Sequence, residues 1–274
     1  MLSSVSRIGI GVALRARELR ERFHLSDGAL ALIAVAIAAV GMASTVLAKV
    51  AEDVIARNGL EVHDAANLQA LDAHRSAWTI DLADVVTRVG SIGLLLVAAV
   101  AIGILLWRRH ARLAVAATPL LALVSTGTVV AVTKQVVGRT RPPLGLRLIA
   151  DGEPSFPSGH SADSAAVFIA AGILVAAIVL RRPALRALAV VGGVVLSGGI
   201  GLSRLVLGAH WPTDVLAGWA LGTIVAVTLP TIVLVLLRAT PSSDVPERQG
   251  RAVIGRVLPV LRRQRPTHWT VAAD

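Results

Sequence analysis

The chain of 274 residues is too apolar for an ordinary globular domain, because 55% of its residues are hydrophobic, 16% are charged and the mean hydropathy is +0.73. It contains no cysteine, which excludes disulfides, thiolate catalysis and cysteine-ligated metals. The net charge of +10 comes mainly from arginine, much of it in short blocks between apolar runs. Such blocks are typical of membrane orientation signals, so no nucleic-acid partner is expected.

Six apolar segments are long enough to cross a bilayer, which requires about 20 residues of helix. They are expected near residues 28–48, 89–107, 113–133, 161–180, 184–203 and 214–237. The first is longer than the apolar part of a signal peptide and follows an Arg-rich stretch, so we interpret it as a signal-anchor helix. The sequence therefore predicts an all-α integral membrane protein whose six transmembrane helices form one domain, 28–237.

The two ends of the chain fall outside this domain. The basic segment 1–27 fits either an amphipathic helix on anionic lipid or a merely solvated segment. The basic tail 238–274 lacks a core-forming pattern, and we expect it to be disordered. Within the spans, Pro119 and Pro230 are expected to kink their helices, and the glycine-rich run 192–201 to allow close helix contact.

The distribution of charge predicts the orientation of the chain in the cell membrane. The connectors 108–112 and 181–186 each carry three Arg and no acid, and both ends are Arg-rich, so all four segments are expected to be cytoplasmic. Residues 51–88 carry seven acidic side chains against three Arg. An even number of spans places this segment on the extracytoplasmic side, together with the connectors 134–160 and 204–213.

Three polar blocks fall on the expected extracytoplasmic side: KQVVGRTRP, PSGH and SRLVLGAHWPTD. Taken singly, their basic and histidine side chains could be interfacial anchors or helix caps. Together they bring Lys134, Arg141 and Arg204 close to one another beside hydrocarbon, where mutual repulsion favours the binding of a multiply charged anion.

Each block could contribute a different part of the chemistry. Ser158 and Gly159 immediately precede the fourth span, where free backbone N–H groups and the helix dipole favour a phosphate-like anion. In HWPTD the proline suits the first turn of the sixth span, so Asp214 can hold one nitrogen of His210 while the other faces a substrate. This arrangement favours His210 as the nucleophile and leaves His160 to protonate the departing oxygen.

The three blocks together resemble the signature of the type 2 phosphatidic acid phosphatase superfamily: Lys, six residues, Arg-Pro; Pro-Ser-Gly-His; Ser-Arg, five residues, His, three residues, Asp. Every signature position between residues 134 and 214 is matched, which is far more specific than one short motif. The resemblance implies a hydrolase of phosphomonoesters or diphosphates that needs no metal or cofactor and forms a phosphohistidine at His210. It also implies that the phosphoryl oxygens are bound by Lys134, Arg141, Ser158, Gly159 and Arg204.

The superfamily also contains soluble acid phosphatases and vanadate-dependent haloperoxidases, among which six spans favour a membrane lipid phosphatase. The substrates that the resemblance implies are undecaprenyl or another polyprenyl diphosphate, ranked first because the site is expected to face outward, then phosphatidic acid and phosphatidylglycerol phosphate. A transporter would place ionisable groups near the bilayer midplane, whereas here they gather at one interface. The acids near PSGH are interpreted as solvated or helix-start residues rather than Mg²⁺ ligands; they are Asp151, Glu153 and Asp163.

Overall fold

The computed structural model describes residues 27–150, 152 and 154–239, and every regular element within these ranges is helical. Six of the helices are long and apolar enough to cross a membrane. They are α2 (Asp27–Ala56), α5 (Ile92–His110), α6 (Leu113–Val137), α7 (Gly159–Ile178), α8 (Pro183–Val206) and α9 (Pro212–Ala239). The all-helical fold and the six candidate spans are thus confirmed. The expectations for the segment before residue 27, for most of the tail, and for Asp151 and Glu153 lie outside the described residues.

The helices begin and end at somewhat different residues from those expected. α2 continues to Ala56 rather than ending near residue 48, and its last two turns include an ion pair of 2.7 Å between Lys49 and Asp53. α7 begins at Gly159 rather than near 161, because Ser158 has an extended backbone and forms its N-cap. The PSGH block therefore spans the helix start, with Pro157 and Ser158 before it and Gly159 and His160 in its first turn.

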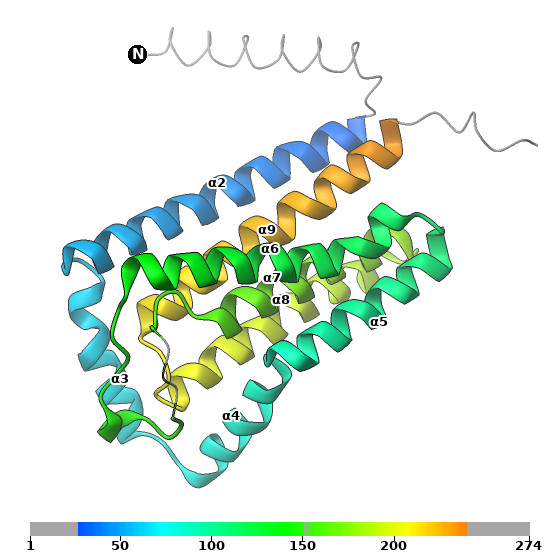
Figure 1. Cartoon of the computed structure of the whole chain (residues 1–274). Helices are drawn as coiled ribbons and strands as arrows, with labels where there is room; N and C mark the ends of the chain where they lie inside the picture. The colour runs from blue at the N-terminus through cyan, green and yellow to red at the C-terminus, as the bar shows by residue number, and fades with distance from the viewer. Residues whose placement is uncertain (1–26, 151, 153, 240–274) are drawn as a thin grey trace, which may run out of the picture.

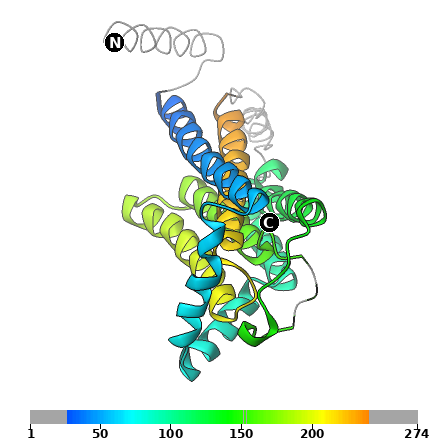
Figure 2. The same cartoon turned by 90° about the vertical axis from the view of Figure 1, so that its left-hand side faces the viewer.

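The acid-rich segment 51–88, whose secondary structure was not predicted, is largely helical. It contains η1 (Glu61–His63), α3 (Asp64–Ala73) and α4 (Ala77–Val89), and α4 packs against α8. One more short element, η2 (Leu144–Leu146), lies between α6 and α7. In Figures 1 and 2, α3 and α4 lie beyond the long helices, at the end of the bundle away from the start of α2.

Helix α7 lies at the centre of the bundle. In its most apolar stretch 67% of the residues are buried, against 11% in α2, and it packs against α5, α6, α8 and α9. α2 packs along α9 on the outside (Figure 1). Large apolar side chains such as Val35 and Ile37 are exposed on α2. Exposed apolar faces of this kind mark surfaces that contact lipid.

Glycines allow the close packing around α7. A Cβ added to Gly193 of α8 would lie 2.4 Å from the carbonyl oxygen of Phe168, and one added to Gly222 of α9 would lie 2.3 Å from that of Ala162. The expected close helix contact of the glycine-rich run 192–201 is therefore confirmed at Gly193. Pro119 and Pro230 lie inside α6 and α9, which continue on both sides of them.

The polar blocks and the Arg-rich connectors lie at opposite ends of the long helices. α6 begins directly after the connector 108–112 and has Lys134 in its last turn. α7 begins with the PSGH block and ends just before the connector 181–186. At the end with the connectors, Arg238 near the end of α9 donates a hydrogen bond of 3.3 Å to the carbonyl of Gly28 at the start of α2.

Candidate active site

His210 lies in a short turn between α8 and α9. Gly208, with φ of +65°, follows the end of α8, and a Cβ at this position would lie 2.0 Å from the carbonyl oxygen of Leu146. Pro212 then begins α9. The imidazole of His210 is therefore enclosed between the end of α8 and the start of α9, and only 1% of the surface of this residue is exposed.

The two ring nitrogens of His210 have different partners. Nδ1 lies 3.3 Å from Oδ2 of Asp214, and Nε2 lies 3.2 Å from Nη1 of Arg141. Because a guanidinium can only donate, Nε2 must accept, which assigns the ring proton to Nδ1 and directs it at Asp214. Burial lowers the pKa of His210 to about 4; Asp214 opposes this shift, whereas the charges of Arg141 and Arg204 add to it. The ring is therefore neutral, with the lone pair of Nε2 facing Arg141.

Asp214 links the second and third polar blocks. Its carboxylate, which is fully buried in the first turn of α9, accepts the N–H of Trp211 at 3.0 Å. Its carbonyl accepts the N–H of Ser158 at 3.0 Å. The N–H of Ser158 is thus already bonded, contrary to the expectation that it is free for an anion. The N–H groups of Gly159 and His160 precede the first intrahelical bond of α7, which joins the N–H of Ala162 to Ser158.

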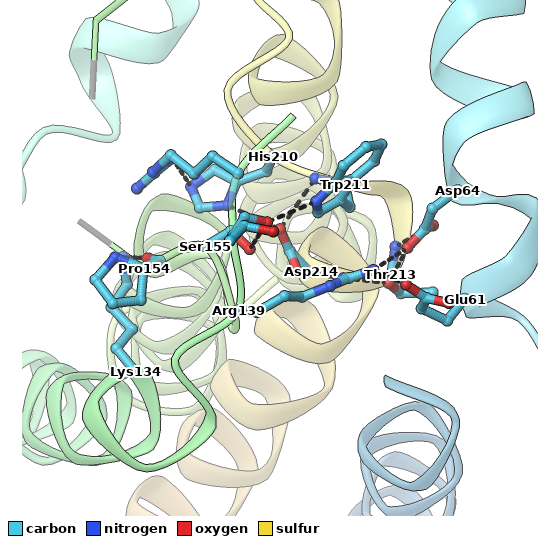
Figure 3. Close-up of polar contacts among 12 residues, drawn as sticks. Glu61, Asp64, Lys134, Arg139, Pro154, Ser155, His210, Trp211, Thr213 and Asp214 are labelled. Atoms are coloured by element: carbon cyan, nitrogen blue, oxygen red, sulfur yellow. Dashed lines mark hydrogen bonds and ion pairs between the residues drawn. The ribbon is translucent and has the colours of Figure 1, made fainter. Parts of the chain in front are cut away.

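Three cations of the polar blocks lie at this end of the bundle on different elements. Arg141 donates to the carbonyl of Ala209 at 2.6 Å, besides its contact with His210. Lys134 is 7% exposed and donates to the carbonyl of Pro154 at 2.6 Å (Figure 3). Arg204 is 3% exposed and donates to the hydroxyl of Thr87 of α4 at 2.8 Å.

His160 is the second residue of α7 and is half-buried. Its imidazole lies close to Gly90, where α4 ends: a Cβ added to Gly90 would lie 3.1 Å from Cδ2 of His160. The predicted general acid therefore lies beside the junction of α4 and α5.

Asp163, expected to be a solvated or helix-start residue, lies one turn after His160 in α7 and is half-buried. Its Oδ1 is buried and has no hydrogen-bond partner, and the charge of Lys134 acts on its carboxylate. Among the residues that the structure describes, no group of three or more His, Asp or Glu side chains could hold a metal ion.

An ion-pair network that was not predicted from the sequence lies behind Asp214 (Figure 3). Arg139, two residues before Arg141, donates from Nη1 to Oδ1 of Asp214 at 2.6 Å and from Nη2 to Oδ2 of Asp64 at 2.7 Å. Asp64, the first residue of α3, accepts both the N–H of Thr213 at 3.1 Å and its hydroxyl. Glu61 completes the network, with Oε1 at 3.3 Å from Arg139 Nη2. In the sequence, the acid-rich composition of residues 51–88 is the only signal for the two carboxylates, and it does not indicate that they meet Arg139.

The charges of this network depend on one another because they are buried. Burial raises the pKa of Asp64, although hydrogen bonds from Thr213 and Arg139 oppose the shift. Burial would lower the pKa of Arg139, but the negative charges of Asp214 and Asp64 outweigh it and raise that pKa. The guanidinium is therefore charged and serves as the shared counter-ion of the two carboxylates.

A cavity of about 600 Å³ lies beside the network, between the ends of α2 and α6. Its walls combine apolar side chains of the two helices with polar groups of the site. They include Val54, Ile55, Arg57, Val136, Arg139 and Trp211. Ile55 and Val136 are 70% and 79% exposed, so the cavity is bordered by the apolar surface of the bundle.

Comparison with known proteins agrees with the resemblance read from the polar blocks. The sequence pattern of the PAP2 superfamily matches residues 115–236, which include all three blocks. Phosphatidylglycerophosphatase B of Bacillus subtilis (strain 168) is 36% identical over 92 residues, which are 33% of this chain and 44% of that protein. The match thus spans less than half the length of this curated relative.

The fold is also similar to that of a solved structure. The crystal structure of a transmembrane PAP2-type phosphatidylglycerolphosphate phosphatase from Bacillus subtilis superposes with a TM-score of 0.60. The alignment covers 78% of this chain and 98% of that one, with 24% sequence identity. At this identity the likeness concerns the fold, and it supports a multi-pass membrane protein.

Proposed function

We propose that the chain is a metal-independent membrane lipid phosphatase with His210 as its nucleophile, on the premise that residues 115–236 match the sequence pattern of the PAP2 superfamily. The observation that carries the proposal is the neutral ring of His210, held by Asp214 through Nδ1 and facing Arg141 through Nε2. A nucleophile in a phosphotransfer site needs such a lone pair next to cations that bind the phosphoryl group.

In the first step Nε2 of His210 attacks phosphorus, and the bond between phosphorus and the leaving oxygen breaks. His160 gives its proton to that oxygen, so the lipid leaves as a neutral alcohol or as a monophosphate. Asp214 accepts a stronger hydrogen bond from Nδ1 as positive charge develops on the ring. The product of this step is a phosphohistidine.

In the second step His160, now neutral, takes a proton from water, and the resulting hydroxide attacks phosphorus. The bond between phosphorus and Nε2 breaks, inorganic phosphate leaves, and His210 returns to its neutral form. Phosphoryl transfer relies on positioning and charge stabilisation. We assign these tasks to Lys134, Arg141, Arg204 and the start of α7 at Ser158 and Gly159.

Two observations support a lipid substrate. The site lies at the end of a bundle of six candidate membrane spans, and the cavity beside it combines apolar walls with Arg57 and Arg139. A lipid could keep its tail in the bilayer while its head group reaches the cations. The name of the curated relative favours phosphatidylglycerol phosphate. A polyprenyl diphosphate or phosphatidic acid would fit the same chemistry.

We further propose that the site faces the extracytoplasmic side. The Arg-rich connectors 108–112 and 181–186 lie at the opposite end of the long helices, and clusters of Arg in short connectors favour the cytoplasm.

The proposal is tested by measuring phosphate release from purified protein in mixed micelles that contain phosphatidylglycerol phosphate, a polyprenyl diphosphate or phosphatidic acid. A water-soluble phosphomonoester serves as the comparison substrate, and the His210→Ala variant controls for contaminating phosphatases. We expect release from at least one lipid that exceeds release from the soluble ester and disappears in the variant. Release from no lipid, or equal release by the variant, would contradict the proposed function.

A further inference from the structure

We propose that Arg139 and Asp64 act together as positioning residues for the nucleophilic histidine, and that helix α3 is thereby part of the catalytic apparatus. The inference rests on the proposed phosphatase function and goes beyond it, since neither residue occupies a position of the three-part signature. It is carried by the network that joins α3, the loop after α6 and the start of α9.

The two carboxylate oxygens of Asp214 have separate partners. Oδ2 accepts from His210 and from the N–H of Trp211, while Oδ1 lies 2.6 Å from Nη1 of Arg139. A fully buried carboxylate requires a compensating cation. Arg139 supplies that charge and, because it binds Oδ1, it prevents the carboxylate from rotating away from the imidazole.

Arg139 must itself be fixed in place if it is to hold the carboxylate of Asp214. Gly138, with φ of +58°, ends α6 and turns the chain, so that Arg139 extends towards α9. Its side chain is 9% exposed and its guanidinium lies 5.7 Å from the ring of Trp211. Its planar fork binds Asp214 with one nitrogen and Asp64 with the other. A lysine could not make both contacts with the same geometry.

Asp64 connects the guanidinium of Arg139 to α9, the helix that carries Asp214. Its Oδ1 accepts the N–H of Thr213, and its Oδ2 accepts both the hydroxyl of Thr213 and Nη2 of Arg139. Thr213 is the residue immediately before Asp214. Asp64 thus fixes the start of α9 and the guanidinium at the same time.

The arrangement also polarises His210. Two buried carboxylates share one cation, Arg139, on the Nδ1 side of the ring, and Glu61 adds further negative charge there. Arg141, by contrast, contacts the ring at Nε2. Negative charge near Nδ1 stabilises the ring as it becomes positive in the attack on phosphorus. Loss of Arg139 should therefore slow the formation of phosphohistidine and leave the cations that bind phosphate in place.

The experiment compares full-length wild type with Arg139→Ala, Arg139→Lys, Asp64→Asn and the double variant Arg139→Ala/Asp64→Asn. Arg88→Ala is the matched control, since Arg88 is an exposed arginine of α4 that pairs with Asp84 at 2.5 Å. For each protein we would measure kcat and KM with an aryl phosphate, the inhibition constant of inorganic phosphate, and the rate of phosphoenzyme formation by rapid quench.

We expect Arg139→Ala to lower kcat and the phosphoenzyme rate by about 10–100-fold, as is typical for groups that orient a reactive residue, with the phosphate inhibition constant unchanged. Arg139→Lys should recover only part of the rate, and Asp64→Asn should lose less than Arg139→Ala. The double variant should be no slower than Arg139→Ala, because the two residues act as one unit. Methylguanidinium should restore part of the lost rate through the adjacent cavity, whereas methylammonium should not.

Several results would overturn the inference. One is an Arg139→Ala variant whose kcat equals that of the wild type. Another is a variant with unchanged kcat that phosphate inhibits more weakly, because Arg139 would then be a phosphate ligand. Losses that multiply in the double variant would refute the joint role of the two residues. If Arg139→Ala fails to fold, Asp64→Asn and Arg139→Lys must show the same selective loss of kcat. A wild-type protein without phosphatase activity contradicts the proposed function itself, whereas an active wild type with a fully active Arg139→Ala variant contradicts only this inference.

Discussion

The guanidinium of Arg141 lies 3.2 Å from Nε2 of His210. A second positive charge at this nitrogen would be repelled by Arg141, and the burial of the ring opposes protonation as well. The contact therefore keeps the lone pair of His210 unprotonated until a phosphoryl group binds. It also places a cation where the oxygens of that group would arrive.

We predict that His210 remains neutral throughout the physiological pH range. Its pKa is lowered to about 4, so the ring takes up a proton only as the pH falls through that value, well below the usual value of about 6.5. Histidine-selective NMR of the protein in detergent tests this prediction, with the His210→Ala variant identifying the signal. The Arg141→Gln variant should titrate at higher pH, because it removes one of the charges that oppose protonation. A wild-type midpoint near the usual histidine value would show that the ring is more solvated than the structure indicates.

The long spans could be predicted from sequence because their apolar runs exceed the length that a bilayer requires. Their ends could not, because local backbone conformation decides them. With Ser158 as its N-cap, α7 begins at Gly159, two residues before the expected start of that span. The helices α3 and α4 have no apolar run long enough to indicate a membrane span, so they were not predicted. Their helical structure depends in part on packing against the bundle, as α4 does against α8.

The cations and histidines of the candidate site were predicted from their spacing in three blocks, and the structure brings His210, Asp214 and Arg141 into direct contact. The support behind Asp214 was not predicted. Asp64 and Arg139 are 75 residues apart, and neither lies in a pattern whose spacing indicates the other. A pairing of this kind is set by the tertiary fold, so composition alone indicated only that acids and bases share one end of the bundle.

The neighbouring glycines of α8 give a matched test of the helix packing. A Cβ at Gly193 would lie 2.4 Å from the carbonyl oxygen of Phe168, whereas one at Gly192 meets nothing within 4 Å. Gly193→Ala should therefore separate α7 from α8 and lower the thermal stability in detergent, at a cost of about 1–3 kcal/mol. Gly192→Ala should be neutral or stabilising, since alanine favours a helix over glycine by about 1 kcal/mol in water. Equal melting temperatures for the two variants would contradict the close contact.

The absence of cysteine from the sequence allows a direct test of the proposed orientation. Ala66 lies exposed on α3 and Ala111 lies exposed in the Arg-rich connector after α5. In intact cells, Ala66→Cys should react with a membrane-impermeant thiol reagent, and Ala111→Cys should react only after the membrane is permeabilised. The opposite labelling pattern would place the site on the cytoplasmic side.

Activity should survive EDTA and be inhibited by vanadate. The proposed mechanism assigns the stabilisation of phosphoryl charge to Lys134, Arg141 and Arg204, so removal of divalent cations should leave kcat unchanged. Vanadate can adopt the five-coordinate geometry of the transferring phosphoryl group and should bind at Nε2 of His210. Inhibition should be measured against an aryl phosphate, with His210→Ala as the binding control. Loss of activity in EDTA that Mg²⁺ restores would require a different mechanism.

The last prediction separates the roles of the two histidines. His210→Ala should abolish turnover and leave no phosphoenzyme, because neither the cations nor His160 can replace the missing attack. His160→Ala should slow the reaction of a lipid phosphate by about 10²–10⁴-fold, since the leaving oxygen then departs without a proton. With an activated aryl phosphate, whose oxygen needs no proton, the first step should remain fast in this variant.

Phosphate should consequently accumulate on His210 in the His160→Ala variant when an aryl phosphate is supplied, since no base then activates water for the second step. Rapid-quench labelling measures this accumulation directly, and a phosphohistidine is recognised because it is labile to acid and stable to base. Label trapped on His160→Ala but absent from His210→Ala would support the assigned roles. Label trapped on His210→Ala but absent from His160→Ala would show that His160 is the nucleophile and His210 the acid. The contacts of His210 with Asp214 and Arg141 would then serve proton transfer.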